Sequence, residues 1–212
     1  MKQLGNVLII GDSYSTFENC VPNDNHVWYY ENVDNGRTDV IKKEQTWWWQ
    51  LINETDSALL LNESFSGATV CNTERPTIPH TSFVYRLHGL IERGFFKENA
   101  IDTVFVFGGT NDSWIDSPLG KAKYENFTEE DLKEVFPAYS YLLKTLKETA
   151  PQAKIVAILN CDIKPLIVEN FKIICENYDV EYVQLENIGK QNGHPNQLGM
   201  TQIKNQILKA LN

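Results

Sequence analysis

Five short apolar segments recur along the chain, separated by stretches in which the apolar residues follow a helical spacing. The segments are NVLII at 6–10, ALLLN at 58–62, TVFVF at 103–107, KIVAIL at 154–159 and EYVQL at 181–185. Most of them are continuously apolar and rich in β-branched residues, instead of alternating between apolar and polar positions. This pattern predicts strands that are buried on both faces, as in a parallel sheet.

The stretches between these segments predict helices. At 128–149 apolar residues recur at intervals of three and four, and Thr128 with Asp131 resembles a capping box. Pro137 falls inside this stretch and is expected to kink or divide the helix, because proline lacks the backbone N–H. Further helices are expected at 46–53, 82–94, 165–178 and 198–211.

Strands that alternate with helices favour a parallel sheet with helices on both faces. Ligands of such sheets bind beyond the carboxyl ends of the strands, near the point where the strand order reverses. No Pro-, Gly- or Ser-rich linker and no internal repeat divides the sequence, so residues 1–212 are expected to form a single domain.

Composition narrows the classes of partner. The chain has 28 acidic and 19 basic residues, a formal net charge of −9, so neither nucleic acid nor a membrane surface is expected as a partner. The four cysteines are scattered without a C-x-x-C pair, and the sequence predicts no metal site and no disulfide framework. No glycine-rich phosphate loop occurs, and no cofactor is expected. The first residues lack a signal-peptide pattern, so a reduced, cytoplasmic setting is expected.

Residues suited to chemistry follow three of the predicted strands and precede the last helix. Ser13 ends Gly-Asp-Ser after the first strand, Gly67 lies in SFSGATV after the second, and Asn111 lies in GGTND after the third. His194 stands directly before Pro195 at the start of the last helix. Each has an ordinary explanation, since Ser, Gly and Asn are common in turns and a lone His is usually structural. Together they supply a nucleophile, a general base and donors to an oxyanion.

In their order and placement, four motifs resemble the conserved blocks of the SGNH (GDSL-type) hydrolase family over nearly the whole chain. They are Gly11-Asp12-Ser13, Gly67, Gly109-x-Asn111-Asp112 and His194-Pro195. The resemblance implies a three-layer α/β/α sandwich around a five-stranded parallel, flavodoxin-like sheet. It implies that Ser13 is the nucleophile and His194 its base. The oxyanion hole would comprise the backbone N–H groups of Ser13 and Gly67 and the side-chain amide of Asn111.

The sequence departs from the family pattern three residues before His194, where Gln191 replaces the usual aspartate. In serine proteases the corresponding neutral substitution lowers kcat about 10⁴-fold. Three arrangements are open. A main-chain carbonyl orients His194 in a Ser–His dyad, or Gln191 takes over the orienting role, or an acid such as Glu186 or Asp162 does. If none of them does, hydrolysis is slow or lost.

The segment 17–45 has no sustained period, and we expect it to be a loop insertion near the active site. Its Trp28, Tyr29 and Tyr30 either line a substrate cleft or pack the loop onto the domain. The run TWWWQ at 46–50 carries more tryptophan than one helix face buries, so part of it is expected at a homo-oligomer contact or at the cleft wall.

The predicted function is a serine ester hydrolase that acts through an acyl-serine intermediate on a small-molecule ester. The aromatic and amide residues of 17–45 favour a short-chain, acetyl ester of a carbohydrate or similar polar molecule, because rings stack on sugar faces and amides bind hydroxyls. A broader acyl-esterase, lipase or thioesterase is the nearest alternative. A non-catalytic ligand-binding protein on the same fold is the alternative from another class.

Overall fold

A five-stranded parallel sheet forms the centre of the computed structural model, which describes residues 3–33, 36–73, 75 and 78–211. The strands are β1 (Asn6–Gly11), β2 (Ala58–Ser64), β3 (Thr103–Gly108), β4 (Lys154–Leu159) and β5 (Glu181–Gln184). Their spatial order is β2-β1-β3-β4-β5. This is the flavodoxin-like order, so the fold class predicted from the sequence is confirmed.

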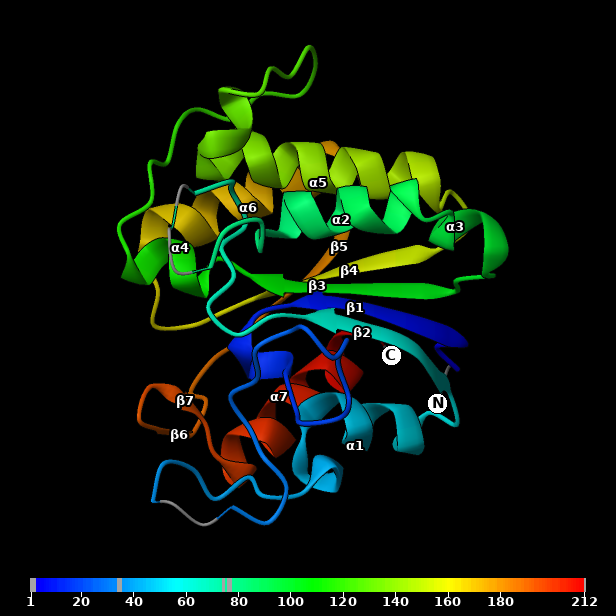
Figure 1. Ribbon diagram of the computed structural model, residues 1–212, viewed down its shortest axis with the longest axis vertical. Helices are drawn as coiled ribbons and strands as arrows, with labels where there is room; N and C mark the ends of the chain where they lie inside the picture. Colours follow the sequence, from blue (N-terminus) through cyan, green and yellow to red (C-terminus); the bar gives the residue numbers. More distant parts are fainter. Residues whose placement is uncertain (1–2, 34–35, 74, 76–77, 212) are drawn as a thin grey trace.

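Helices cover both faces of the sheet (Figure 1). One face carries α1 (Trp47–Glu54) and α7 (Gln197–Leu211), and the other carries α2 (Phe83–Glu92), α5 (Val135–Thr149) and α6 (Pro165–Asn177). Shorter elements are α3 (Phe95–Glu98), α4 (Thr110–Trp114), the antiparallel hairpin of β6 (Lys190–Gln191) and β7 (His194–Pro195), and 3-10 turns at Ser13–Ser15, Lys43–Gln45 and Asp131–Lys133. The sequence patterns did not predict α4 or this hairpin.

Two hydrophobic cores lie on opposite faces of the sheet, because successive strand residues point to opposite sides. In β1, Leu8 and Ile10 enter the core shared with α2, α5 and α6, whereas Val7 and Ile9 enter the core shared with α1 and α7. All four side chains are fully buried. Burial on both faces explains why the strands read as continuous apolar runs.

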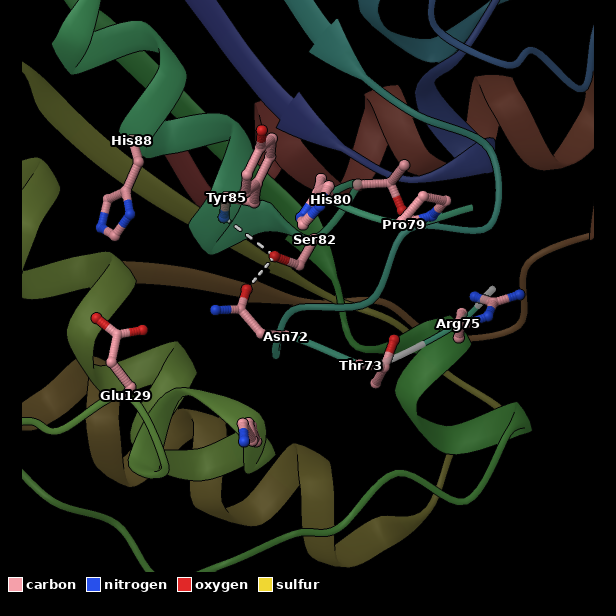
Figure 2. Close-up of a pocket in the computed structure, with 11 residues that line it drawn as sticks. Asn72, Thr73, Arg75, Pro79, His80, Ser82, Tyr85, His88 and Glu129 are labelled. Carbon is pink, nitrogen blue, oxygen red and sulfur yellow. Dashed lines mark hydrogen bonds between the residues drawn. The ribbon is translucent and has the colours of Figure 1, made fainter. Parts of the chain in front are cut away.

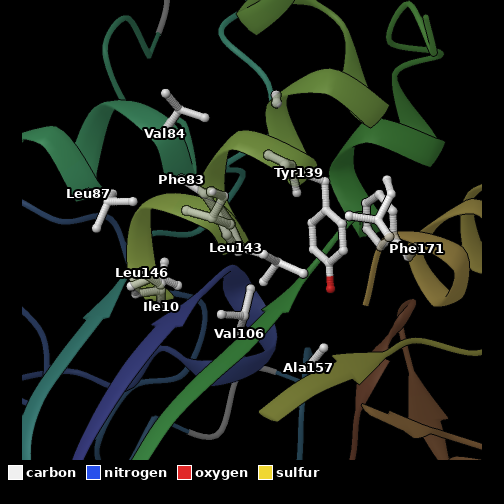
Figure 3. Packing of buried hydrophobic residues seen from close by; sticks show 14 of the residues in the cluster. Ile10, Phe83, Val84, Leu87, Val106, Tyr139, Leu143, Leu146, Ala157 and Phe171 are labelled. Atoms are coloured by element: carbon white, nitrogen blue, oxygen red, sulfur yellow. The ribbon is translucent and has the colours of Figure 1, made fainter. Parts of the chain in front are cut away.

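Figure 3 shows the first of these cores, in which Ile10 and Val106 rise from the sheet towards the helices. The rings of Tyr139 on α5 and Phe171 on α6 stack with centroids 3.6 Å apart and planes within 7°. This contact locks α5 against α6 over the carboxyl half of the sheet, where Gly109 lies against Phe171.

The helix expected at 128–149 is divided, as Pro137 suggested, but the break precedes the proline. A 3-10 turn ends at Lys133, and Glu134 adopts an extended conformation before α5 begins. Pro137 then sits in the first turn of α5, where the helix needs no donor from its nitrogen. The predicted capping box is present, since Thr128 N donates to Asp131 Oδ2 at 2.6 Å and Asp131 N donates to Thr128 Oγ1 at 3.3 Å.

The tryptophans of α1 are buried more fully than their spacing suggested. Trp47 and Trp48 are both buried in the core, and their indole N–H groups are satisfied there by Ser15 Oγ at 3.3 Å and Ser15 O at 2.9 Å. Trp49 is half-buried and lies under Lys43 Nζ at 4.6 Å. Of the three tryptophans, only Trp49 is therefore accessible enough to contribute to a homo-oligomer contact or to a cleft wall.

Outside positions 34 and 35, which are not described, the predicted insertion at 17–45 contains no α-helix or strand, and its one regular element is the 3-10 turn at Lys43–Gln45. Figure 1 shows it below the sheet, on the side of α1 and α7 and beside the β6–β7 hairpin. Among the described residues, no helix is long and apolar enough to span a bilayer.

Candidate active site

The site lies where the strand order reverses. β1 pairs with β2 on one side and with β3 on the other, so the carboxyl ends of these three strands are neighbours. In an open α/β sheet this position forms a crevice, because the chain leaves adjacent strands in opposite directions. The loops that follow β1, β2 and β3 carry Ser13, Gly67 and Asn111 respectively.

Ser13 opens a 3-10 turn directly after β1, and local hydrogen bonds fix that turn. Asp12 Oδ1 accepts from Tyr14 N at 3.0 Å, and Thr16 Oγ1 donates to Ser13 O at 3.0 Å. Burial raises the pKa of Asp12 to about 7, although the hydrogen bond from Tyr14 N acts in the opposite direction. The Asp12 side chain thus stabilises the turn that carries Ser13. Among the described residues it makes no hydrogen bond to His194.

His194 reaches Ser13 from the other end of the chain. Its Nε2 lies 2.9 Å from Ser13 Oγ, and both side chains are buried. The β6–β7 hairpin presents the ring, with Gly193 in the left-handed conformation at φ 76°. Tyr14 OH donates to Gly193 O at 2.6 Å, which ties this hairpin to the turn that carries Ser13.

The second ring nitrogen of His194 fixes its tautomer. Nδ1 lies 3.1 Å from the main-chain oxygen of Asn192. A carbonyl oxygen only accepts, so Nδ1 carries the hydrogen and Nε2 has a free lone pair that faces the Ser13 hydroxyl. Burial lowers the pKa of His194 to about 4, and the cations of Arg37 and Lys190 act in the same direction against the Asn192 carbonyl. The imidazole is therefore neutral at pH 7.

The side chains proposed to orient His194 are engaged elsewhere. Gln191 Nε2 donates to Gly36 O at 3.0 Å, and Asp162 pairs with Lys190 at 3.1 Å. Glu186 lies exposed after β5, where its backbone bonds to the side chain of Gln206. The hydrogen-bond partner of His194 Nδ1 is therefore the Asn192 carbonyl, and neither Gln191 nor Glu186 makes this contact.

Gly67 and Asn111 are held together by the loop after β2. Asn111 Nδ2 donates to Ala68 O at 2.8 Å, next to Gly67. An amide nitrogen has two hydrogens, so this bond orients the Asn111 amide and leaves it one further donor. Gly67 has φ 91°, a conformation that a side chain would strain, and its own carbonyl accepts from Arg75 Nη1 at 2.6 Å.

Asp112, the neighbour of Asn111, holds the same loop from beneath. Its carboxylate accepts from Val70 N at 2.9 Å and 3.1 Å, and from Cys71 N at 3.4 Å. Complete burial raises its pKa, which these main-chain donors oppose. The Asp of the third motif is thus a structural anchor for the loop that carries Gly67.

The insertion places Trp28, which was expected either to line a cleft or to pack the loop onto the domain, directly on His194. The indole of Trp28 stacks on the imidazole of His194, with centroids 3.4 Å apart and planes within 8°. The next residue, Tyr29, is fully buried and donates from its OH to Pro195 O at 2.8 Å. Trp114 of α4 meets the His194 ring edge-on at 5.5 Å and is 49% exposed. The sequence signal for Trp28 was only its place in an aromatic cluster.

A cavity of about 650 Å³ lies beside the loop after β2, but neither Ser13 nor His194 lines it (Figure 2). Its lining includes the stacked rings of His80 and Tyr85, 4.8 Å apart, and the hydrogen-bonded pair of Ser82 and Asn72. Among the described residues, no group of three or more His, Cys, Asp or Glu side chains is arranged to hold a metal ion.

The chain is similar over nearly its whole length to a family model and to solved structures. Residues 5–211 match the family model of the GDSL-like Lipase/Acylhydrolase. A crystal structure from Bacteroides ovatus, described as a GDSL-like lipase, is 39% identical with a TM-score of 0.89 and covers 99% of each chain. A second, from Bacteroides uniformis and described in the same way, is 38% identical with a TM-score of 0.88, covering 98% of this chain and 95% of that one.

A more distant likeness is to an acetyl xylan esterase from Butyrivibrio proteoclasticus, at 17% identity and a TM-score of 0.60, over 99% of this chain and 63% of that one. At that identity the likeness is one of fold alone. A search of curated proteins found no match.

Proposed function

Because the chain belongs to the GDSL-like lipase/acylhydrolase family, an ester hydrolase family, we propose that it cleaves carboxylic esters with a Ser13–His194 dyad through an acyl-serine intermediate. The observation that carries this proposal is the 2.9 Å contact between Ser13 Oγ and an unprotonated His194 Nε2. A serine hydroxyl is a weak nucleophile until a base in hydrogen-bond reach takes its proton.

In the first half of the reaction Ser13 Oγ attacks the ester carbonyl while its proton moves to His194 Nε2. The tetrahedral intermediate collapses to the acyl-serine, and the leaving alcohol takes the proton from Nε2. In the second half a water molecule attacks the acyl-serine, His194 again accepts the proton, and the acid leaves as Ser13 Oγ is reprotonated. During each half the imidazolium keeps its Nδ1–H on the Asn192 carbonyl.

The oxyanion of both tetrahedral intermediates needs donors that are in place beforehand. The candidates are the backbone N–H groups of Ser13 and Gly67 and the second N–H of the Asn111 amide. The bond from Asn111 to Ala68 O supports this role, because it fixes the amide without using its whole donor capacity.

As substrate we propose a short-chain ester, an acetyl group on a carbohydrate or a similarly small polar molecule. Trp114 supports this choice, since an indole that is 49% exposed and lies beside His194 offers a face on which a sugar ring stacks. This proposal specifies a narrower substrate class than membership of the family does, and it rests on the exposed Trp114 ring beside His194.

The proposal is tested by hydrolysis of 4-nitrophenyl acetate, butyrate and octanoate, beside acetylated xylo-oligosaccharides, by the wild type and Ser13→Ala. We expect activity that Ser13→Ala abolishes and that falls as the acyl chain lengthens. A fluorophosphonate should label Ser13 in the wild type. Absence of both turnover and labelling would favour a ligand-binding protein, and a preference for octanoate would favour a lipase over an acetyl esterase.

A further inference from the structure

The His194 ring is one layer of a stack of three side chains. Trp28 lies flat on it at 3.4 Å, and Arg37 Cζ lies 3.3 Å from the centre of the Trp28 ring. Because both groups approach one indole this closely, they occupy its two opposite faces. Arg37 and Trp28 come from the insertion, whereas His194 comes from the β6–β7 hairpin.

Hydrogen bonds of Trp28 and of its neighbour Tyr29 reach the two segments that carry the dyad. Its backbone N–H donates to Thr16 Oγ1 at 2.9 Å, and the same hydroxyl donates to Ser13 O at 3.0 Å. On the other side, Tyr29 OH donates to Pro195 O at 2.8 Å, one residue beyond His194. The insertion is therefore bound both to the 3-10 turn that carries Ser13 and to strand β7, which carries His194.

The indole N–H of Trp28 is destabilising where it lies. Among the described residues, Trp28 Nε1 is buried without a hydrogen-bond partner. An unpaired buried donor disfavours the folded state, and a phenyl ring at this position would avoid that penalty. A role for the wide aromatic face explains why the larger ring stands here.

We propose that Trp28 is a positioning residue of His194, which adds to the hydrogen bond with the Asn192 carbonyl a constraint by stacking that the missing aspartate would otherwise help to supply. This inference rests on the proposed Ser13–His194 dyad. A flat ring at 3.4 Å blocks rotation of the imidazole out of its plane, which keeps Nε2 on Ser13 Oγ. Its π face also attracts the imidazolium that forms when Nε2 takes the serine proton.

The other groups around the ring act differently. Arg37 and Lys190 are cations, which disfavour a charged imidazole, and the Asn192 carbonyl stabilises it only through the hydrogen bond from Nδ1, in the plane of the ring. The rings of Tyr14 and Trp114 lie farther away, at 5.4 Å and 5.5 Å, and steeply inclined to the imidazole. Trp28 is thus the group that faces the imidazole plane in contact.

The test compares Trp28→Leu with Trp28→Phe. Loss of the aromatic face in Trp28→Leu is expected to lower kcat for 4-nitrophenyl acetate about 10- to 100-fold, through misplacement of the base, with little change in KM. Trp28→Phe keeps a flat but narrower ring, so we expect its kcat to fall about threefold, which is less than in Trp28→Leu. The rate of Ser13 labelling by a fluorophosphonate should fall in parallel with kcat.

The chain offers a matched control in the stacked pair of His80 and Tyr85, which lies at the cavity in Figure 2. Tyr85→Leu removes a similar ring from a histidine that the dyad does not use, and kcat should remain that of the wild type. The inference is overturned if Trp28→Leu keeps its kcat, if Trp28→Phe loses as much as Trp28→Leu, or if Tyr85→Leu loses as much as Trp28→Leu.

A second readout needs no turnover. In the wild type, the NMR signals of the His194 ring protons should be shifted upfield by the indole, and its ¹⁵N shifts should report the Nδ1–H tautomer. In Trp28→Leu the upfield shift should vanish. The imidazole, free to rotate, should also leave the Asn192 carbonyl part of the time, so that the second tautomer becomes populated. Unchanged ¹⁵N signals overturn the positioning role whatever the esterase assay gives, whereas an inactive, unlabelled wild type overturns the proposed function instead.

Discussion

His194 Nδ1 and the main-chain oxygen of Asn192, two residues earlier, lie 3.1 Å apart within one hairpin. This contact sets the tautomer of the base without any acidic side chain. A carbonyl orients the imidazole as an aspartate would, but it brings no negative charge to raise the basicity of the ring. The pH dependence of kcat/KM should therefore reflect the low pKa of His194.

We expect kcat/KM for 4-nitrophenyl acetate to stay level from neutral pH down to about pH 5 and to fall only near pH 4. Only neutral His194 can accept the serine proton, and burial lowers its pKa from 6.5 to about 4. The measurement is a pH–rate profile over about pH 3.5 to 8, with tryptophan fluorescence at each pH as a control for unfolding. An acidic limb near 6.5 would show that the base is not held in this buried state.

Substitutions at Asn192 should act through its backbone. Asn192 has φ 50°, which Gly adopts freely and a β-branched residue adopts only with strain of about 1–2 kcal/mol. Asn192→Gly should therefore keep the carbonyl on His194 and most of kcat, whereas Asn192→Val should displace it and lower kcat about 10-fold or more. Equal losses in both variants would point to the Asn192 side chain instead.

Gln191→Ala should leave kcat and the pH–rate profile of the wild type nearly unchanged. The Gln191 amide donates to Gly36 O. Its removal therefore deletes one exposed hydrogen bond to the insertion and leaves the hydrogen bonds of His194 in place. A fall in kcat of about 10⁴-fold, as for loss of a triad acid, would restore Gln191 as the orienting residue.

Asn111→Ala should lower kcat about 10²- to 10³-fold with a small change in KM, because an oxyanion donor acts mainly in the transition state. Asn170→Ala is the matched control, since Asn170 is a half-buried asparagine of α6, remote from the dyad in sequence, whose side chain donates to Leu166 O. If Asn111→Ala raised KM and left kcat unchanged, the Asn111 amide would be a substrate-binding group and not an oxyanion donor.

Asp12→Asn should make unfolding less dependent on pH. The folded pKa of Asp12 is raised from 3.8 to about 7, so the wild type loses stability from this group as the pH rises from about 4 to above 7. Asparagine does not titrate, and the variant should therefore gain on the wild type by roughly 2–4 kcal/mol between about pH 5 and pH 8. Urea unfolding of both proteins at the two pH values measures the difference, and a constant difference would contradict the raised pKa.

The sheet, its strand order and most helices could be predicted because burial on two faces leaves a periodic record in the sequence. The break before Pro137 was displaced by three residues, since the extended residue is Glu134 and the proline fits the first turn that follows. The tryptophan run misled for a different reason. Ser15 accepts from both Trp47 and Trp48, and no periodicity shows that two indoles share one serine.

The contact between Ser13 and His194 follows from the motifs, but the group that orients the base does not. Every residue carries a main-chain oxygen, so nothing in the sequence marks that of Asn192. Trp28 was visible as an aromatic residue, but the aperiodic insertion gave no register that would place it on His194. Both depend on how two loops fold against each other, which local pattern does not encode.

The hydrogen bonds between the insertion and the hairpin have a dynamic consequence. Asn192 Nδ2 donates to Arg37 O at 2.9 Å, Gln191 Nε2 donates to Gly36 O at 3.0 Å, and Gln197 N donates to Asp39 Oδ1 at 2.8 Å. The insertion cannot swing open as a gate without carrying the base with it, so 36–39 and 190–197 should exchange their amide hydrogens as one cooperative unit. We therefore expect substrate to approach from another side, where the half-exposed Trp114 borders His194.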